Sequence, residues 1–329
     1  MNDARYSHTA SVLPNGKVLV TGECNGSNNI LYSAELYDPS TGIWTTTRDM
    51  TNARSDHTAS VLSNGQVLVT GGWNGSIAIN SAELYDLSTG IWTTTSNMND
   101  ARDWHTASIL SNGKVLFTGG INIIGTLNSV ELYDPSTGTW TATSSMTNAQ
   151  YRHTASVLSN GKVLVAGGYD NSIGYLSSAE LYDPSTGTWT TTGNMNNARE
   201  VHTASVLSNG NVLVTGGAGN TGYLNSAELY DLSTGTWTTT SNMNSIRPWH
   251  TASVLSTGKV LVTGGLDNSG VLNSAELYDP STSTWTSISN MTDARHEHTA
   301  SVLSNGKVLV TGGGSVVNGI TALNSAELY

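Results

Sequence analysis

Hydrophobic and polar positions follow the same four-part pattern along the chain, six times in full and a seventh time without the last part. In the unit at residues 54–97, the segment HTASVL precedes the continuous apolar run QVLVTGG, and the alternating segment SAELY precedes IWTTT. A short Val/Leu run is typical of a strand buried on both faces, and alternation is typical of a strand with one buried face. Each unit therefore predicts four β-strands, and no segment has the period of a helix.

Turn signals separate the predicted strands. Asn64-Gly65 lies between the first two strands, and Asn-Gly between apolar runs indicates a tight hairpin. The segment DLSTG, which is DPSTG in other units, follows the third strand and fits a type I turn. The four strands of a unit are therefore expected to form one antiparallel sheet.

The unit recurs every 48 or 49 residues, as its first histidine shows: His8, His57, His105, His153, His202, His250 and His298. A small sheet with two apolar faces cannot bury both alone, so its copies must pack face to face around an axis. We therefore expect an all-β, seven-bladed β-propeller in a single domain, stabilised by Val, Leu, Tyr and Trp between blades. The expected blades are residues 5–49, 54–97, 102–145, 150–194, 199–242, 247–290 and 295–329.

The glycines and aromatic residues of each unit resemble the kelch repeat. Gly71-Gly72 precede Tyr85, Trp92 follows that tyrosine by seven residues, and the preceding AR..H segment matches the usual start of the repeat. The Tyr/Trp pair recurs as Tyr37/Trp44, Tyr133/Trp140, Tyr182/Trp189, Tyr230/Trp237 and Tyr278/Trp285. The resemblance covers the whole chain and implies a kelch-type propeller, a superfamily that includes the central domain of galactose oxidase.

Three units depart from this consensus. Gly22-Glu23 stands where a glycine pair is expected, and Gln150 replaces the arginine of the fourth unit. The seventh unit stops at Tyr329, before its turn and Trp strand, so we expect blade seven to lack its outermost strand. In the kelch family a strand from the opposite terminus often completes this blade. The resemblance thus predicts a TGTWTTT-like segment before Met1 or after Tyr329 in the native protein.

Charge and composition narrow the possible functions. The formal net charge of −11 argues against a general nucleic-acid binder, which needs a basic surface to neutralise phosphates. The longest apolar runs are too short to span a membrane, and the single cysteine, Cys24, excludes an intrachain disulfide framework. Motifs typical of serine hydrolases, phosphate-binding loops and zinc peptidases do not occur. We therefore expect no nucleic-acid partner, no membrane span, no cofactor and no metal, and the oligomeric state stays open.

Differences between the units cluster in two places: the two residues between the Arg and the His, and the loop after the glycines. Because successive strands alternate in direction, both clusters lie on one face of the expected propeller, which we call the varied face. The constant SNGK and DPSTG turns lie on the opposite face. Binding residues collect on loops held by a rigid scaffold. The candidate ligand-binding residues are Tyr6, Asp56, Trp73, Trp104, Tyr151, Arg152, Tyr169, Glu200, Tyr223, Trp249, His296 and Glu297.

The aromatic residues outside the repeat skeleton map to the varied face. Rigid rings beside Asn, Asp and Gly are typical of surfaces that bind proteins, and they also stack on sugars. We therefore predict a non-enzymatic recognition module for a protein, peptide or glycan. The alternative is that these aromatic side chains are scattered over an exposed surface and bind no ligand.

The recurring histidines and arginines are more typical of a structural role than of catalysis or metal binding. A residue present in every blade is spread around the ring, so we expect each histidine to fix its strand to a neighbouring backbone group. We expect each arginine to pair with the glutamate of a third strand, such as Glu83, rather than to join an anion-binding ring.

The resemblance to galactose oxidase carries an alternative, a carbohydrate-active or copper-dependent oxidase. Such an enzyme implies a copper site with Tyr and His ligands and a Tyr–Cys crosslink. Cys24 is placed on the varied face, but no sequence feature marks its Tyr and His partners. Kelch propellers host both binding and catalysis, so the fold does not choose between them. A further candidate for a cation is a set on the connections between blades, of which only neighbours can share an ion: Asp56, Asp103, Glu200, His296 and Glu297.

Overall fold

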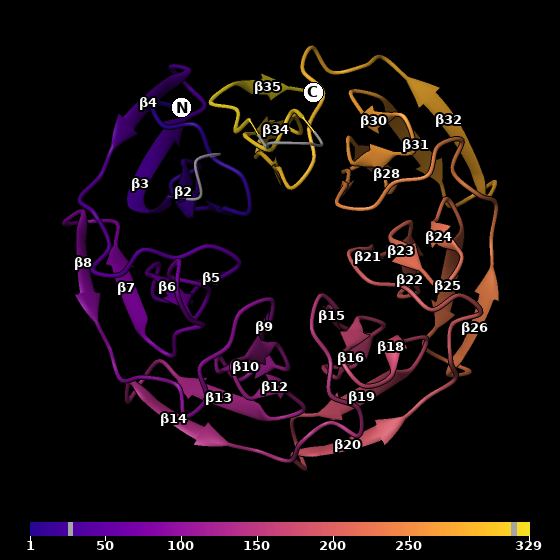
Figure 1. Cartoon of the computed structure of the whole chain (residues 1–329), viewed down its shortest axis with the longest axis horizontal. Coiled ribbons are helices and arrows are strands. Elements are labelled where there is room, and N and C mark those ends of the chain that lie inside the picture. Colours follow the sequence, from indigo (N-terminus) through magenta and orange to yellow (C-terminus); the bar gives the residue numbers. More distant parts are fainter. Residues whose placement is uncertain (26–28, 317–320) are drawn as a thin grey trace.

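The computed structural model describes residues 1–25, 29–316 and 321–329 and arranges them as seven antiparallel sheets around a central axis (Figure 1). Six sheets have four strands and the last has three. The expected seven-bladed propeller, with a seventh blade that lacks its outermost strand in this chain, is confirmed. None of the described residues forms a helix long and apolar enough to cross a membrane.

The two inner strands of each blade come from HTASVL and the Val/Leu run. The innermost strands are β1 (Thr9–Val12), β5 (Thr58–Val61), β9 (Thr106–Ile109), β15 (Thr154–Val157), β21 (Thr203–Val206), β27 (Thr251–Val254) and β33 (Thr299–Val302). The second strands are β2 (Val18–Cys24), β6 (Val67–Thr70), β10 (Val115–Thr118), β16 (Val163–Ala166), β22 (Val212–Thr215), β28 (Val260–Thr263) and β34 (Val308–Thr311). From β6 onward every residue of the second strands is buried, as a continuous Val/Leu run predicts.

The two outer strands come from SAELY and the Trp segment. The third strands are β3 (Ile30–Asp38), β7 (Ala82–Asp86), β13 (Val130–Asp134), β19 (Ala179–Asp183), β25 (Ala227–Asp231), β31 (Ala275–Asp279) and β35 (Ala326–Leu328). The outermost strands, largely exposed, are β4 (Ile43–Thr46), β8 (Ile91–Thr94), β14 (Thr139–Ala142), β20 (Thr188–Thr191), β26 (Thr236–Thr239) and β32 (Thr284–Ile288). Each Tyr of a third strand pairs with the Trp opposite, with ring centroids 5.0 Å apart for Tyr85 and Trp92.

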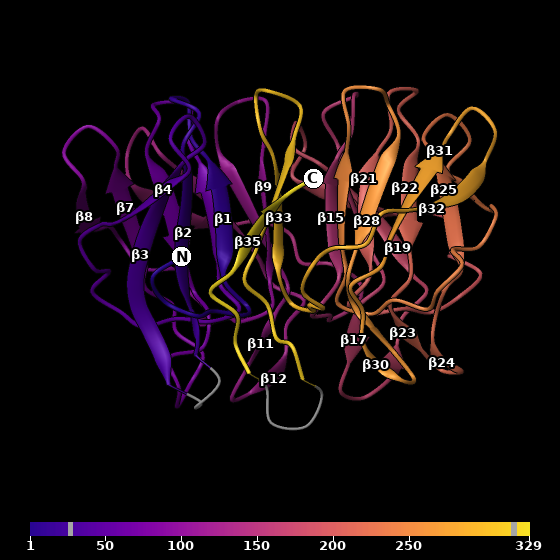
Figure 2. The same ribbon diagram turned by 90° about the horizontal axis from the view of Figure 1, so that it is seen from above.

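Short hairpins project from the varied face of four blades (Figure 2). They are β11 (Ile121–Asn122) with β12 (Gly125–Thr126), β17 (Tyr169–Asp170) with β18 (Gly174–Tyr175), β23 (Ala218–Gly219) with β24 (Gly222–Tyr223), and β29 (Leu266–Asp267) with β30 (Gly270–Val271). Blade one differs, because Glu23 replaces a glycine. There the strands β2 and β3 continue into the loop, with a register shift between Thr21 and Glu23.

Apolar side chains pack between blades rather than within them. One cluster joins Leu19 and Met50 of blade one to Val67, Val69 and Tyr85 of blade two, and the same arrangement recurs around the ring. The expected contribution of Val, Leu and Tyr is therefore confirmed, and Trp packs against these clusters from the rim. The sequence reasoning did not foresee the methionine that each connection between blades adds to the core.

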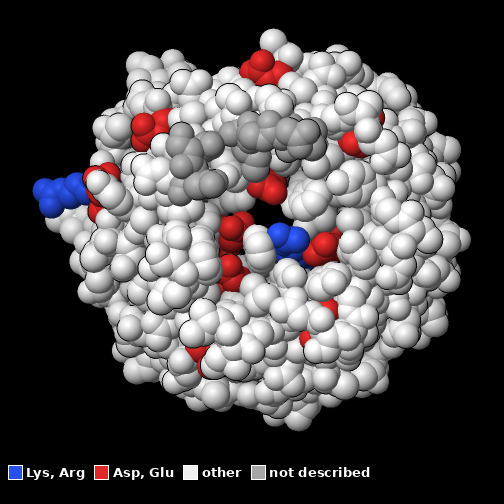
Figure 3. Space-filling view, viewed as in Figure 1, with Lys and Arg blue, Asp and Glu red and all other residues white. Residues whose placement is uncertain are grey.

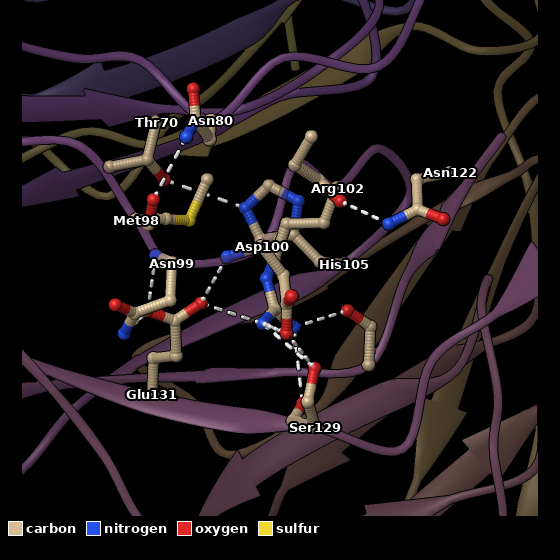
Figure 4. A network of polar contacts seen from close by, with 12 residues as sticks. Thr70, Asn80, Met98, Asn99, Asp100, Arg102, His105, Asn122, Ser129 and Glu131 are labelled. Atoms are coloured by element: carbon tan, nitrogen blue, oxygen red, sulfur yellow. Dashed lines mark hydrogen bonds and ion pairs between the residues drawn. The ribbon is translucent and has the colours of Figure 1, made fainter. Parts of the chain in front are cut away.

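The arginines form buried ion pairs with the third-strand glutamates, as predicted, and an anion-binding ring of arginines is wrong. In blade three Arg102 Nη2 lies 2.9 Å from Glu131 Oε1 (Figure 4). Arg102 Nη1 donates to the carbonyl oxygen of Gly119 at 2.6 Å. Glu131 also accepts the backbone N–H groups of Asn99 and Asp100. The glutamate therefore fixes the connection between two blades as well as the arginine.

The repeat histidines link neighbouring blades through hydroxyl groups, and the expected contact with a backbone group is present at His250, whose Nδ1 lies 2.7 Å from the carbonyl oxygen of Arg247. His105 Nε2 lies 3.0 Å from Thr58 Oγ1 and 3.4 Å from Thr70 Oγ1 of the preceding blade. Burial lowers the pKa of His105 well below its ordinary value, so the ring is neutral. His8 makes the same contacts with Thr299 and Thr311 of blade seven, which closes the ring.

Candidate functional site

The second residue of every varied pair takes part in a closed ring of backbone hydrogen bonds at the mouth of the central channel. Each N–H donates to the carbonyl oxygen of the equivalent residue in the preceding blade, at 3.1–3.3 Å. All seven have φ between 46° and 55°, a left-handed conformation that costs non-glycine residues about 1–2 kcal/mol each. We call them the central ring: Ser7, Asp56, Trp104, Arg152, Val201, Trp249 and Glu297. The geometry is constant, so only the side chains distinguish its seven positions.

The central ring carries acid on one side and a single arginine on the other. Asp56 and Glu297 occupy the positions on either side of Ser7, whose Oγ donates to Glu297 Oε2 at 2.9 Å. Burial, with the charge of Glu297, raises the pKa of Asp56 to about 6, and burial also raises that of Glu297. Across the channel, Arg152 pairs with Glu200 at 3.5 Å. Figure 3 shows acidic groups around the central opening, which leads into a cavity of about 310 Å³.

An aromatic row runs outward from the ring across blades three and four. The guanidinium of Arg152 lies 3.8 Å above the ring of Trp104, and Trp104 stacks with Tyr151 at a centroid distance of 5.7 Å. Tyr151 in turn contacts Tyr169, which contacts Tyr175 edge to face. The structure therefore brings four of the predicted residues into one continuous surface, in which Arg152 is held by cation–π contact and by Glu200.

A separate aromatic pair lies across blades five and six. Tyr223 and Trp249 approach edge to face with centroids 6.4 Å apart. Trp249 belongs to the central ring and lines the channel, and Tyr223 is exposed on the hairpin of blade five. The varied face thus presents aromatic groups on two sides of the channel.

A pocket of about 500 Å³ lies between blades two and three. Its walls are largely apolar, and Asp56 and Asp103 contribute the carboxyl groups. Asp103 is 6% exposed, and burial together with the charge of Asp56 raises its pKa to about 7. The other lining residues are Trp73, Ala78, Trp104, Ile121, Asn122 and Ile123.

Three predicted residues are buried and offer little surface to a ligand: Tyr6, His296 and Glu200, which pairs with Arg152. Tyr6 forms an antiparallel β-bridge with Cys24, and its hydroxyl group makes a hydrogen bond with the thiol. Burial raises the pKa of Tyr6. His296 is 4% exposed, and its Nδ1 lies 2.9 Å from the carbonyl oxygen of Gly314. All three are first members of a varied pair, whose backbone bridges to the segment after the glycines, and none of them lines the cavity of the central channel.

Sequence reasoning missed several residues of this face. Ser7 and Val201 complete the central ring, although neither residue type had marked them as candidate ligand-binding residues. Four isoleucines of the loops are exposed to solvent: Ile77, Ile123, Ile124 and Ile173. The sequence could have indicated these exposed residues, because they are apolar residues inside otherwise polar loops, such as the segment INII.

The residues around Cys24 do not fit a copper centre. The pocket beside Cys24 and Tyr6 is lined by Ile30, Ser55, Asp56 and other residues, with no histidine among those described. The repeat histidines already contact threonine hydroxyls through Nε2. Within the described ranges, no group of three or more His, Cys, Asp or Glu side chains is arranged to hold a metal ion.

Comparison with known proteins agrees with the repeat architecture. Residues 104–313 match the model of the KLHDC2/KLHL20/DRC7 kelch-repeats domain, and residues 5–51 and 54–99 match the kelch motif. No curated protein matches the chain. A solved fungal alcohol oxidase of the AA5 family, in complex with copper, is similar over 95% of this chain and 70% of its own, with a TM-score of 0.78 and 21% identity, which shows a shared fold. Because the kelch models match most of its length, the chain belongs to the kelch-repeat family.

Proposed function

We propose that this propeller is a non-enzymatic recognition module that binds a segment of a partner protein across its varied face. The observation that carries the proposal is the central ring, in which seven blades hold the same backbone geometry and present different side chains. A rigid frame with variable side chains is the arrangement that binding surfaces use, because little conformational entropy is lost when a ligand binds. Protein binding is also typical of the kelch family.

The exposed isoleucines favour a protein segment over a glycan. Ile123 is 83% exposed and Ile124 is 90% exposed, and both lie on the hairpin tip beside the aromatic row. Aliphatic groups bury favourably against apolar side chains, whereas sugars stack on aromatic rings and bond to polar groups. Aromatic and aliphatic groups together suit a peptide of mixed composition.

The alternative is a carbohydrate-active or copper-dependent oxidase, which the likeness to the fungal alcohol oxidase raises. The contact of Tyr6 with Cys24 is the one observation in its favour. The lack of fitting histidines among the described residues near that pair argues against it. Measuring bound copper after reconstitution, followed by an assay for hydrogen peroxide with sugars and alcohols, tests this alternative. Stoichiometric copper with peroxide formation would support the oxidase.

A peptide display library and a glycan array test the proposed function in parallel. The protein, its Trp104→Ala and Trp249→Ala variants, and the control Ile43→Ala are each used as the binding target. Ile43 is exposed on the outermost strand β4, away from the varied face. We expect enriched peptides whose affinity falls about tenfold or more in the two Trp variants and is unchanged in the control. Binding to glycans alone, or peptide binding that the Trp variants leave intact, would overturn the proposal.

A further inference from the structure

The pocket between blades two and three combines apolar walls with a buried carboxylate, one of whose oxygens has no hydrogen-bond partner among the described residues. Trp73 and Ala78 come from blade two, and Trp104 and Ile121 from blade three. Asp103 lies at this pocket with 6% of its surface exposed, and its Oδ1 accepts no hydrogen bond from any residue that the structure describes. A buried acceptor without a donor is costly, and few occur in folded proteins.

Among the described residues, no lysine or arginine forms an ion pair with this carboxylate. Six of the thirteen Lys and Arg residues are the buried arginines paired with glutamates, and five are lysines near the first turn of their blades, on the opposite face. Arg48 is exposed where the outermost strand of blade one ends. Arg152 pairs with Glu200 and stacks on Trp104, and its charge is the weakest of the influences on Asp103. Asp56, on the same pocket, adds a second carboxyl group.

We propose that this pocket binds the side chain of a lysine from the partner protein, with the ammonium group at Asp103 and Asp56 and the four-carbon stem between Trp73 and Trp104. The proposal rests on the proposed function and names the chemistry that one part of the face recognises. Lysine carries an apolar stem and a compact charge, so it matches a pocket whose walls are apolar and whose polar groups are carboxyls. The indole rings add attraction for a cation.

A neutral apolar side chain would suit the same pocket less well. It would exclude water from Asp103 and Asp56 without supplying a hydrogen-bond donor or a charge, and desolvating a carboxylate in this way is unfavourable. An ammonium group supplies three donors and a positive charge at once. The difference between a charged and a neutral ligand of equal shape therefore measures the inference directly.

The test is a ligand-observed NMR titration of the protein with hexylammonium and with 1-hexanol, its neutral counterpart, at about pH 8, where Asp103 is ionised. We expect hexylammonium to bind about tenfold more tightly than hexanol. Asp103→Asn should reduce that preference, with Asp56 left as the only carboxyl group of the described pocket lining, and Trp73→Leu should weaken both ligands. Asp267→Asn is the matched control, because Asp267 lies on the varied face in blade six, remote from the pocket, and should leave binding unchanged. Melting curves establish that each variant is folded.

Equal affinity for hexanol and hexylammonium would overturn the inference, because the positive charge would then contribute nothing to binding. The inference also fails if Asp103→Asn and Asp267→Asn weaken hexylammonium equally, because the attraction would then come from the general negative charge of the face. The titration requires no partner protein, so its failure is distinct from a failure of the peptide display experiment. If the display peptides bind through Trp104 but show no preference for lysine, this inference is refuted. The proposed function is unaffected by that result.

Discussion

The backbone N–H of Ser7 donates to the carbonyl oxygen of Glu297 at 3.1 Å, across a separation of 290 residues. This bond completes the central ring between blades seven and one, where no connecting chain links the two blades. His8 repeats the contacts with Thr299 and Thr311 that the other histidines make within the chain. The junction of blades seven and one therefore has the same contacts as the junctions within the chain, except that Ala166 replaces the second threonine beside His202.

Replacing Gln150 with arginine is expected to stabilise the propeller. Glu180 is 2% exposed and accepts the backbone N–H groups of Thr147 and Asn148, but it lacks the arginine that its equivalents have, and Gln150 contacts Met146 instead. Gln150→Arg should raise the free energy of unfolding by about 1.5–3 kcal/mol, the contribution of hydrogen bonds to a charged group. Urea unfolding measures the change.

The reciprocal variant in blade five is the control. Arg199→Gln leaves Glu228 without its arginine and should lower the free energy of unfolding by about 3–5 kcal/mol. If Gln150→Arg destabilises the protein while Arg199→Gln does so as well, the pocket of blade four has adapted to glutamine and the prediction is wrong.

Gly71→Ala is expected to destabilise the protein much more than Gly113→Ala. Both glycines have positive φ, which costs alanine about 1–2 kcal/mol. A Cβ at Gly71 would also lie 2.5 Å from the carbonyl oxygen of Arg102 and 2.8 Å from His105 Cε1, whereas nothing lies within 4 Å of one at Gly113. Overpacking should add about 1–3 kcal/mol at Gly71. Equal melting temperatures for the two variants would contradict this explanation.

Acid is expected to unfold the propeller because its repeat histidines are buried in the neutral form. Burial lowers the pKa of His8, His153 and His250 to about 3. Below about pH 6.5 these histidines bind more protons in the unfolded chain than in the folded one. The free energy of unfolding therefore decreases as the pH is lowered, by about 1.4 kcal/mol per pH unit for each histidine. Carboxyl groups with raised pKa values, such as Asp56 and Asp103, oppose this fall between about pH 4 and 7.

The contribution of one histidine is measured by comparing the pH dependence of urea unfolding between the protein and His57→Gln. The pKa of His57 is well below its ordinary value, so its removal should reduce the slope by about 1.4 kcal/mol per pH unit between about pH 4 and 6. An unchanged slope would mean that His57 is protonated in the folded state.

Binding of hexylammonium is expected to strengthen as the pH rises from about 5 to 8. Burial raises the pKa of Asp103 to about 7 and that of Asp56 to about 6, and only their ionised forms attract a cation. Asp56 and Arg152 are the charged groups that act on Asp103. In Asp103→Asn the dependence above about pH 7 should disappear, since Asp56 is then ionised. The same NMR titration at four pH values checks this, and a flat profile for the unmodified protein contradicts it.

The sequence by itself determined the number of blades, the four strands of the first six and the three of the seventh. It also determined that the arginine at the start of a unit, such as Arg54, pairs with the glutamate of the third strand, such as Glu83. These features repeat with every unit, and they follow from local signals such as apolar runs, Asn-Gly turns and a fixed spacing. The division into a constant and a varied face also followed, because it depends only on the alternating direction of strands.

Only the tertiary structure decided which varied residues meet. It placed Arg152 on Trp104, aligned Asp103 with Trp73 of the preceding blade and buried Tyr6 against Cys24. In a varied pair, the second residue adopts the left-handed conformation and lines the cavity of the central channel, whereas the first does not line it. Neither that conformation nor contact across a blade boundary has a local signal, since both arise when the closed ring fixes the separation of neighbouring blades.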